Sequence, residues 1–190
     1  GFDEPCYIIA EIGINHNGDL SLAKKLIDAA INSGVNAVKF QKRNLESIYQ
    51  KEILDNPTID SQGTEILIDV LNEVEFNDED FKEIINYCKE KNITFLCTAW
   101  DFVSVNFLEE INISAYKIAS ADLTNFPLIQ YIAKLKKPMI ISTGMAYLSE
   151  VQDALMEVAK CGNSNVILMQ CTSSYPCPPE SMNIKAIDTM

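Results

Sequence analysis

The sequence has one histidine, one tryptophan and no CxxC pair among its 190 residues. Its six cysteines are scattered from Cys6 to Cys177, so neither a zinc site nor a disulfide framework is predicted. We expect reduced thiols, several of them packed in apolar strands as small hydrophobic side chains. His16 has no partners at metal-ligand spacing, and we expect it to support a loop by hydrogen bonding. The sequence therefore predicts no metal ligand within this chain.

Long apolar runs and an excess of basic residues are also missing. The apolar segments are short and bounded by polar residues, so we expect no transmembrane helix. The start, GFDEPCYIIAE, lacks a basic region and a small-residue cleavage site, which favours a cytoplasmic protein without a signal peptide. The net charge of −12 argues against nucleic acid and anionic membranes as partners. It leaves room for an anionic small molecule, because a few lysines and backbone amides can hold a phosphate.

Hydrophobic residues make up 47% of the chain, which is enough for a sizeable core. Strand-like and helix-like sequence patterns alternate along it. Short β-rich runs predict strands at residues 7–13, 37–41, 93–100, 115–120, 138–144 and 166–173. Helical periodicity predicts helices at residues 20–34, 64–73, 77–92, 103–112, 126–137 and 149–162. Repeated β-then-α units with continuous apolar strands predict a parallel sheet covered by helices.

Polar residues indicate where several of these helices begin. Asp19 or Ser21 can cap the first helix, Asn77 the second long one and Ser149 the last, because their side-chain oxygens can accept from the first turn. Gly34 suits the turn that ends the first helix.

No linker rich in proline or glycine divides the chain, so we expect a single domain. The one long irregular stretch is predicted at residues 42–63, and loops of that length are usually functional or flexible. The acidic run at 73–83 is predicted to form a solvated helix face.

Two folds fit the alternation, a doubly wound open sheet and a (β/α)8 TIM barrel. No GxGxxG follows the first strand and no Walker A motif occurs, which removes the commonest nucleotide-binding forms of the open sheet. The strands end repeatedly in polar residues, as a barrel active site requires. We therefore predict an α/β TIM barrel of which about six β/α units are present. Because a barrel has eight strands, residues 1–190 are expected to form only part of one.

Two lysines within strands are candidates for binding an anion. Lys39 and Gln41 share one strand face with Ala37, and Lys117 repeats the pattern two strands later. A buried ammonium must pair or bind an anion, because burying it alone is costly. Hydroxyls at neighbouring strand ends could complete a site for a phosphate and a carboxylate: Thr98, Ser120 and Ser142. Alternatively, each lysine pairs with a carboxylate such as Glu11, and the hydroxyls satisfy backbone groups.

Three further residues are predicted at the same end of the barrel, and each has two possible roles. Glu11 could be a base or water-positioning group near an electrophilic carbon, or a structural partner of a lysine. Asp122 could contact substrate or cap the helix that begins near Phe126. Tyr175, in a proline-rich loop after the sixth strand, could contact substrate or cover the barrel edge.

Five motifs follow one another along essentially the whole chain: AEIGINHNGDLSLAKKLIDAA, AVKFQK, YKIASADLTNFPLI, PMIISTGM and QCTSSYP. In this order they resemble the sialic-acid (N-acetylneuraminate) synthase family. The resemblance implies an N-terminal (β/α)8 barrel followed by a small antifreeze-like domain. The last barrel strands and the antifreeze-like domain would then be absent from residues 1–190.

The resemblance also implies an activity. Such an enzyme condenses phosphoenolpyruvate with an N-acetylated hexosamine, either N-acetylmannosamine or a diamino-dideoxy sugar, to a nine-carbon 2-keto sugar acid with release of phosphate. The residues implied to hold phosphoenolpyruvate are Lys39, Gln41, Thr98, Lys117, Ser120 and Ser142. Those implied in catalysis are Glu11 and Asp122, and Tyr175 is implied to approach the sugar. A divalent metal, Mn²⁺ or Mg²⁺, is implied to polarise the aldehyde from ligands beyond Met190, in a complete enzyme that is a homodimer.

Two other interpretations stay open. One is a phosphate-binding TIM-barrel aldolase-type enzyme, which would form a Schiff base on Lys39 or Lys117. The other is a non-catalytic ligand-binding fragment, which would bind phosphoenolpyruvate without turnover. An incomplete barrel exposes unpaired strand edges, so we expect little activity from the 190-residue piece by itself.

Overall fold

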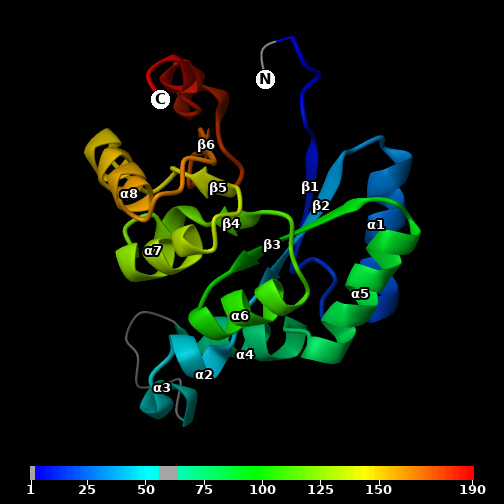
Figure 1. Cartoon of the computed structure of the whole chain (residues 1–190). Helices are drawn as coiled ribbons and strands as arrows, with labels where there is room; N and C mark the ends of the chain where they lie inside the picture. The colour runs from blue at the N-terminus through cyan, green and yellow to red at the C-terminus, as the bar shows by residue number, and fades with distance from the viewer. Residues whose placement is uncertain (1–2, 56–63) are drawn as a thin grey trace.

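A computed structural model describes residues 3–55 and 64–190, and in this part of the chain six strands alternate with helices (Figure 1). All five strand pairings are parallel, and the strands lie in sequence order with β1 and β6 at the edges. The strands are β1 (Ile9–Gly13), β2 (Ala37–Lys42), β3 (Thr94–Ala99), β4 (Tyr116–Ile118), β5 (Met139–Ser142) and β6 (Val166–Met169). The predicted α/β architecture with parallel strands is confirmed.

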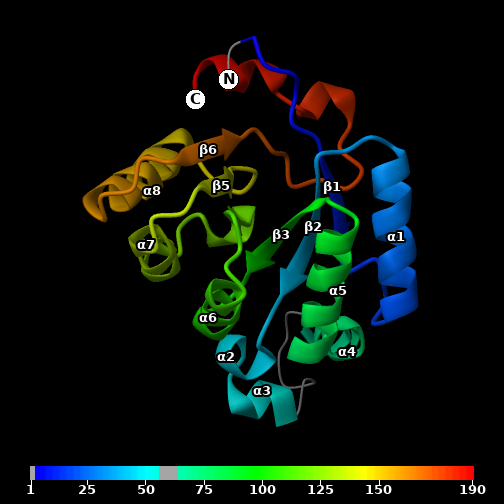
Figure 2. The same cartoon turned by 45° about the vertical axis from the view of Figure 1, so that its right-hand side comes forward.

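Helices lie on the outside of a sheet that curls into part of a barrel (Figure 2). The α-helices are α1 (Leu20–Asn32), α2 (Leu45–Ile48), α3 (Lys51–Asp55), α4 (Thr64–Val74), α5 (Asp78–Glu90), α6 (Phe102–Glu110), α7 (Phe126–Lys134) and α8 (Leu148–Lys160). Three short 3-10 helices are η2 (Ser120–Asp122), η3 (Pro179–Ser181) and η4 (Ile184–Asp188). A helix follows each of the first five strands, so the curled sheet has the geometry of a partial TIM barrel.

Alternation along β2 sends its side chains into two different environments. Val38 and Phe40 belong to the main core between the sheet and the helices. Ala37 instead packs with Leu96 and Ile140 in a smaller cluster on the opposite face of the sheet. Because successive strand residues point to opposite faces, the concave face that carries Ala37 also carries Lys39 and Gln41, as predicted.

The helix starts match the sequence predictions at two positions and differ at a third. Asp19 caps α1, where its Oδ1 accepts from two backbone N–H groups at 2.7 and 3.1 Å. Asn77 caps α5 by accepting from the Asp80 N–H at 2.9 Å. The prediction that Ser149 caps α8 is wrong, because α8 begins at Leu148 and the preceding residue is the cap. The Glu150 carboxylate, in the first turn of α8, accepts a hydrogen bond of 2.7 Å from the backbone N–H of the capping residue Tyr147.

The stretch 42–63 is not irregular throughout, so the prediction of one long loop is wrong for its first half. Two short helices, α2 and α3, occupy most of residues 45–55, and residues 56–63 lie outside the described part of the chain. Asn44 begins α2 by accepting from the Ser47 N–H at 3.0 Å. Lys51 and Asp55 form an i,i+4 ion pair of 2.7 Å within α3. Neither helix buries a residue, so neither has the apolar periodicity that identifies a helix in a sequence.

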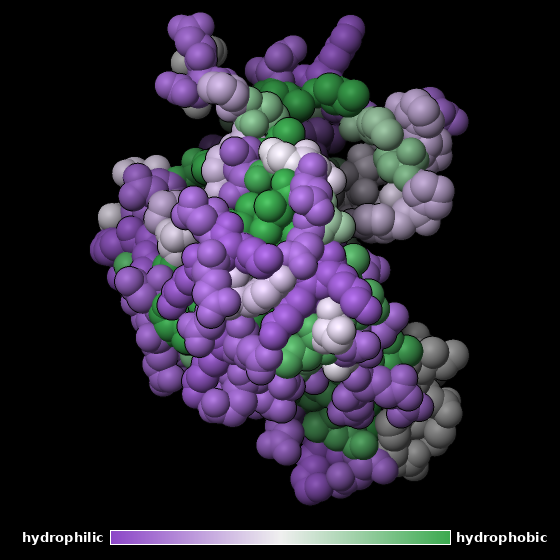
Figure 3. All heavy atoms as spheres, turned by 90° about the vertical axis from the view of Figure 1, so that its right-hand side faces the viewer, coloured by the Kyte–Doolittle hydropathy of each residue, from purple (hydrophilic) through white to green (hydrophobic). Residues whose placement is uncertain are grey.

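The face of the molecule formed by α1 and α5 is covered mainly by hydrophilic residues (Figure 3). The two helices are joined there by an ion pair of 2.6 Å between Lys24 and Glu83. Asp78 and Glu79 in the first turn of α5 are exposed, so the predicted solvated helix face is present at the start of α5. The prediction is wrong for Glu75, which precedes the helix and whose side chain is only 13% exposed. In residues 3–55 and 64–190, no helix combines the length and the apolar character needed to span a bilayer.

Candidate active site

Polar side chains from five neighbouring strands meet on the concave face near the carboxyl ends of the strands. Strand register places them side by side: Glu11 pairs with Lys39, Gln41 with Thr98, and Thr98 with Lys117. Ser142 ends β5, next to the strand that carries Lys117. Six of the nine residues predicted for the site are therefore brought together by the parallel sheet: Glu11, Lys39, Gln41, Thr98, Lys117 and Ser142.

Lys39 joins three strands through its ammonium group. Its Nζ lies 2.7 Å from Glu11 Oε2 on β1 and donates to Thr98 Oγ1 on β3 at 3.1 Å. The Lys39 side chain is 9% exposed, whereas that of Glu11 is 50% exposed. Glu11 therefore partly balances the buried charge while one side of its carboxylate remains open to solvent.

Lys117 is buried without a carboxylate partner among the described residues. Its Nζ donates to Ser142 Oγ and to the Ile118 carbonyl oxygen, each at 2.6 Å. Burial, and then the positive charge of Lys39, lower the pKa of Lys117 to about 8, against a smaller opposing influence of Cys171 and Glu11. Two ammonium groups with one carboxylate leave an excess of positive charge, which favours an anion on this face.

Ser120 and Ser142 attach neighbouring segments to the site. Ser120 Oγ accepts from the Gly144 N–H at 3.0 Å, which connects η2 to the turn after β5. The Ser142 hydroxyl lies between Lys117 and Cys171, whose Sγ is 3.3 Å away. These contacts fix the Ser142 hydroxyl beside the buried ammonium of Lys117 and the Ser120 hydroxyl at the turn after β5.

Asp122 does not cap α7, and that alternative is wrong. The capping residue is Asn125, whose Oδ1 accepts from the Leu128 N–H and whose Nδ2 donates to Asp122 Oδ1 at 3.1 Å. Asp122 Oδ2 is buried and has no hydrogen-bond partner among the described atoms. Burial raises the pKa of Asp122, and the hydrogen bond from Asn125 opposes this shift.

Tyr175 is another predicted residue that the sheet does not bring to the strand-end group. It lies in the segment after β6, and 95% of its surface is exposed. Because the Tyr175 side chain is so exposed, it does not pack against the strand-end residues. Its predicted contact with a sugar stays a prediction.

His16 supports the loop after β1, as expected. It is 2% exposed, and its ring stacks on Phe76 with 4.0 Å between the ring centroids. Its Nδ1 accepts from the Gly18 N–H at 3.2 Å. Burial lowers the pKa of His16 to about 4, and a hydrogen bond to the Gly13 backbone opposes this shift.

Arg43, which contacts Gln41, and its two neighbours Glu75 and Trp100 escaped the sequence analysis. Arg43 Nη2 donates to Gln41 Oε1, and the guanidinium of Arg43 contacts both Glu75 and Trp100. The signal that could have found two of them is the alternation of strand residues, because Arg43 continues the Lys39 and Gln41 series by one step. Trp100 continues the β3 series from Thr98 in the same way.

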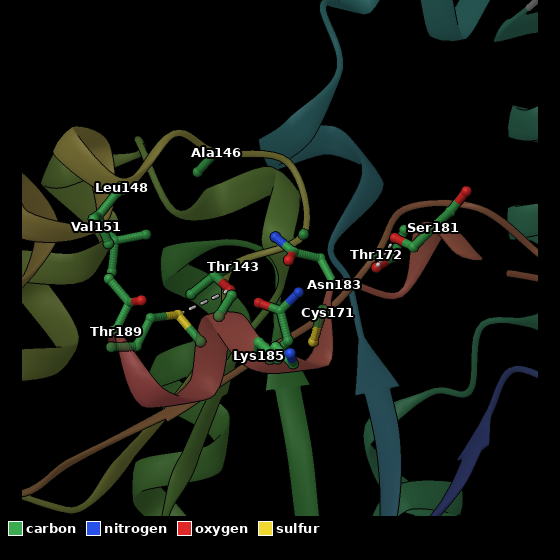
Figure 4. Close-up of a pocket in the computed structure, with 14 residues that line it drawn as sticks. Thr143, Ala146, Leu148, Val151, Cys171, Thr172, Ser181, Asn183, Lys185 and Thr189 are labelled. Atoms are coloured by element: carbon green, nitrogen blue, oxygen red, sulfur yellow. Dashed lines mark hydrogen bonds between the residues drawn. The ribbon is translucent and has the colours of Figure 1, made fainter. Parts of the chain in front are cut away.

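A pocket of about 590 Å³ lies beside this site, between the turn after β5, the start of α8 and the C-terminal segment (Figure 4). Thr143 and Met190 meet in it, with 3.7 Å between Thr143 Oγ1 and Met190 Sδ. None of the nine predicted residues lines it. The strand-end residues thus form a separate, polar part of the concave face.

The donor set of the site does not fit a divalent metal ion. Across residues 3–55 and 64–190, no group of three or more His, Cys, Asp or Glu side chains is placed to hold one. The Glu11 carboxylate is already paired with Lys39, and a second ammonium lies nearby. No step is therefore assigned below to a metal held by these residues.

The chain is similar to known proteins along nearly its whole length. The chain is 39% identical over 98% of its length to the spore coat polysaccharide biosynthesis protein SpsE of Bacillus subtilis, and it covers 50% of that protein. It is 40% identical over 96% of its length to N,N'-diacetyllegionaminic acid synthase of Campylobacter jejuni, and it covers 56% of that protein. The chain thus spans about half the length of these relatives.

A solved structure shows the same fold. The crystal structure of N-acetylneuraminic acid (sialic acid) synthetase from Leptospira borgpetersenii, in complex with citrate, matches 98% of this chain with a TM-score of 0.86 and 34% identity. The match covers 61% of that chain. The model of the NeuB family matches residues 26–190. The chain therefore belongs to the NeuB family, and the predicted resemblance to sialic-acid synthases is confirmed.

Proposed function

We propose that the full-length protein containing this chain is a sugar-acid synthase. It condenses phosphoenolpyruvate with an N-acetylated hexosamine, N-acetylmannosamine or a related diamino-dideoxy sugar, to a nine-carbon 2-keto sugar acid and releases phosphate. The observation that carries this proposal is the pair of buried lysines, Lys39 and Lys117, which together have one carboxylate partner, Glu11, within the described part of the chain. Phosphoenolpyruvate carries a carboxylate and a phosphate, and two ammonium groups on one face can bind both.

Each polar group on the concave face has a role in binding phosphoenolpyruvate. Lys39 and Lys117 pair with its two anionic groups, and their hydrogen bonds to Thr98 and Ser142 hold both ammonium groups in place. The amide of Gln41 supplies a further donor. A charge-assisted hydrogen bond contributes about 1.5 to 3 kcal/mol, so loss of either lysine weakens binding strongly.

The reaction forms one C–C bond and breaks one C–O bond. C3 of phosphoenolpyruvate attacks the aldehyde carbon of the open-chain sugar, whose oxygen takes a proton, and positive charge develops at C2. Water adds at C2 and gives a proton to the carboxylate of Glu11. The bond between C2 and the phosphate oxygen then breaks, and the C2 hydroxyl gives its proton to the departing phosphate. The C2 hydroxyl oxygen thereby becomes the keto oxygen, and inorganic phosphate leaves. The two lysines stabilise the negative charge on the departing phosphate.

The compartment and assembly remain part of the proposal. All six cysteines are free thiols, which supports a reducing compartment such as the cytoplasm. A homodimer and a sugar contact by Tyr175 stay predictions of the family resemblance.

The test uses the full-length protein with phosphoenolpyruvate, Mn²⁺ or Mg²⁺ and a panel of amino sugars, and reads nine-carbon products by mass. Lys39→Met and Lys117→Met should each raise the KM for phosphoenolpyruvate about 10- to 100-fold. Lys137→Met is the control, because Lys137 pairs with Glu109 at 2.9 Å just before β5, at the opposite end of that strand. A wild-type protein that neither binds phosphoenolpyruvate nor forms product would overturn the proposal.

One observation favours a second candidate, a Schiff-base aldolase. A lysine whose pKa lies near 8, as that of Lys117 does, can act as an amine nucleophile. Borohydride added with substrate would then attach the substrate carbon skeleton to Lys117, which peptide mass mapping detects. An unmodified Lys117 under turnover conditions excludes this candidate.

A further inference from the structure

We propose that Arg43 is a positioning residue that turns the side-chain amide of Gln41 so that its NH2 group, and not its oxygen, faces the anion site. The inference rests on the proposed function, because it concerns how phosphoenolpyruvate is held. Arg43 directly follows β2 and lies on the same side of the chain as Lys39 and Gln41. Its Nη2 donates to Gln41 Oε1.

This contact determines which end of the amide faces the site. A guanidinium has five N–H donors and no acceptor, so only the oxygen of the Gln41 amide can face Arg43. Without such a partner, a glutamine amide can bind in either of two orientations. Arg43 thereby makes Gln41 a pure donor toward the concave face, which suits a carboxylate or phosphate oxygen.

The NH2 group of Gln41 points toward the rest of the site. A Cβ atom added to Gly13 would lie 3.4 Å from Gln41 Nε2 and 2.9 Å from Glu11 Oε1. The amide nitrogen and the Glu11 carboxylate therefore both lie against the Gly13 backbone at the end of β1. Glu11 in turn pairs with Lys39, so the Gln41 donors belong to the same cluster.

Arg43 is held by contacts on two sides. Its backbone N–H donates to Glu75 Oε1 at 2.8 Å, and its Nη1 lies 3.6 Å from Glu75 Oε2. The guanidinium carbon lies 4.7 Å from the ring centroid of Trp100. The side chains of Arg43 and Glu75 are only 10% and 13% exposed. These contacts fix the plane of the guanidinium and with it the direction of the bond to Gln41.

Stability alone gives little reason for a charged pair at this position. Burial lowers the pKa of Arg43 and raises that of Glu75, so it acts against both charges. Arg43 Nη1 and Glu75 Oε2 have no hydrogen-bond partner among the described atoms. Buried ion pairs of this kind contribute about as much stability as apolar side chains of the same size. The orientation of Gln41 is what an apolar replacement could not supply.

Lys42 provides a matched control on the opposite face of the same strand. It is also a buried cation with an ion pair, 2.7 Å to Asp78. Its Nζ lies 4.7 and 4.5 Å from the ring centroids of Phe81 and Phe107. Loss of Lys42 removes a buried ion pair and aromatic contacts from the end of β2 without touching Gln41.

The experiment measures phosphoenolpyruvate binding by calorimetry, and KM and kcat, in the full-length protein. We expect Arg43→Met to raise the dissociation constant and KM for phosphoenolpyruvate about tenfold, with the KM for the sugar unchanged within about twofold. Arg43→Gln should do the same and keeps a polar side chain if Arg43→Met does not fold. Arg43→Lys, which still presents only donors, should recover most of the affinity. Lys42→Met should lower the unfolding midpoint and leave phosphoenolpyruvate affinity unchanged.

A double-mutant cycle separates positioning from a general structural effect. If Arg43 acts through Gln41, the variant with both Arg43→Met and Gln41→Ala binds phosphoenolpyruvate as Gln41→Ala alone does. Fully additive losses, or wild-type affinity in both Arg43→Met and Arg43→Gln, would overturn the inference while wild-type binding keeps the proposed function intact. A wild-type protein that does not bind phosphoenolpyruvate would overturn both.

Discussion

The ammonium of Lys117 donates a hydrogen bond of 2.6 Å to the hydroxyl of Ser142 on the adjacent strand. Lys117 also donates to a backbone carbonyl oxygen, and it has no carboxylate partner among the described residues. The pKa of Lys117 is lowered to about 8 by burial and then by Lys39. The charge of the site therefore changes close to neutral pH.

Phosphoenolpyruvate affinity should fall as the pH rises above the pKa of Lys117, about 8 in the free protein. Anion binding requires the ammonium form, so the dissociation constant should rise about tenfold per pH unit above that value. Calorimetric titration of the full-length protein across this range measures the slope. Lys117→Arg, which stays charged, should flatten it; the same slope in Lys117→Met would assign the effect to another group.

His16 should make the protein less stable in acid. Its pKa is about 4 in the folded chain, below the ordinary 6.5, so the unfolded chain binds more protons between these values. Stability therefore rises with pH across this window and falls on acidification, by up to about 3 kcal/mol from this group. Urea unfolding of wild type and His16→Asn, at a series of pH values, isolates the effect. Asparagine offers an acceptor to the Gly18 N–H but does not titrate, so parallel curves would contradict the assignment.

Gly18 and Gly34 form a matched pair for testing the loop after β1. Both have positive φ, +71° and +75°. A Cβ on Gly18 would lie 2.3 Å from the carbonyl oxygen of Glu73, whereas one on Gly34 has nothing within 4 Å. Gly34→Ala should cost about 1 kcal/mol of left-handed strain, and Gly18→Ala about 3 kcal/mol or more because backbone must also move. Chemical denaturation measures both; equal losses would show that the loop can shift away from Glu73.

Two buried thiols should resist modification in the folded protein. Burial raises the pKa values of Cys88 and Cys97 to about 12 from 9.0. Their thiolate fraction, and hence their reactivity, should be about a thousandfold below that of an ordinary thiol. A thiol reagent followed by peptide mass mapping should label the exposed Cys6 first and reach these two only in denaturant. Rapid labelling of Cys97 in the native protein would mean that β3 opens readily.

Much of the fold followed from local patterns. Continuous apolar runs separated by amphipathic segments predicted all six strands and the helices that follow the first five, because burial on both faces imposes that pattern. Strand ends were less well placed: the sixth strand was predicted to residue 173 and ends at Met169. The short helices α2 and α3 were missed because they bury no side chain.

The sequence by itself determined which residues share the concave face, because alternation puts Lys39 and Gln41 on one side of a strand whatever surrounds it. Only the tertiary structure decided how these groups are paired. Parallel register set Glu11 beside Lys39, and left Lys117 without a carboxylate among the described residues. Contact between Arg43 and Glu75 joins residues more than 30 positions apart. Such pairings depend on the curl of the sheet, which brings distant residues together, and on burial. Burial lowers the effective dielectric constant and so strengthens the interaction between neighbouring charges. Local periodicity of the sequence predicts neither effect.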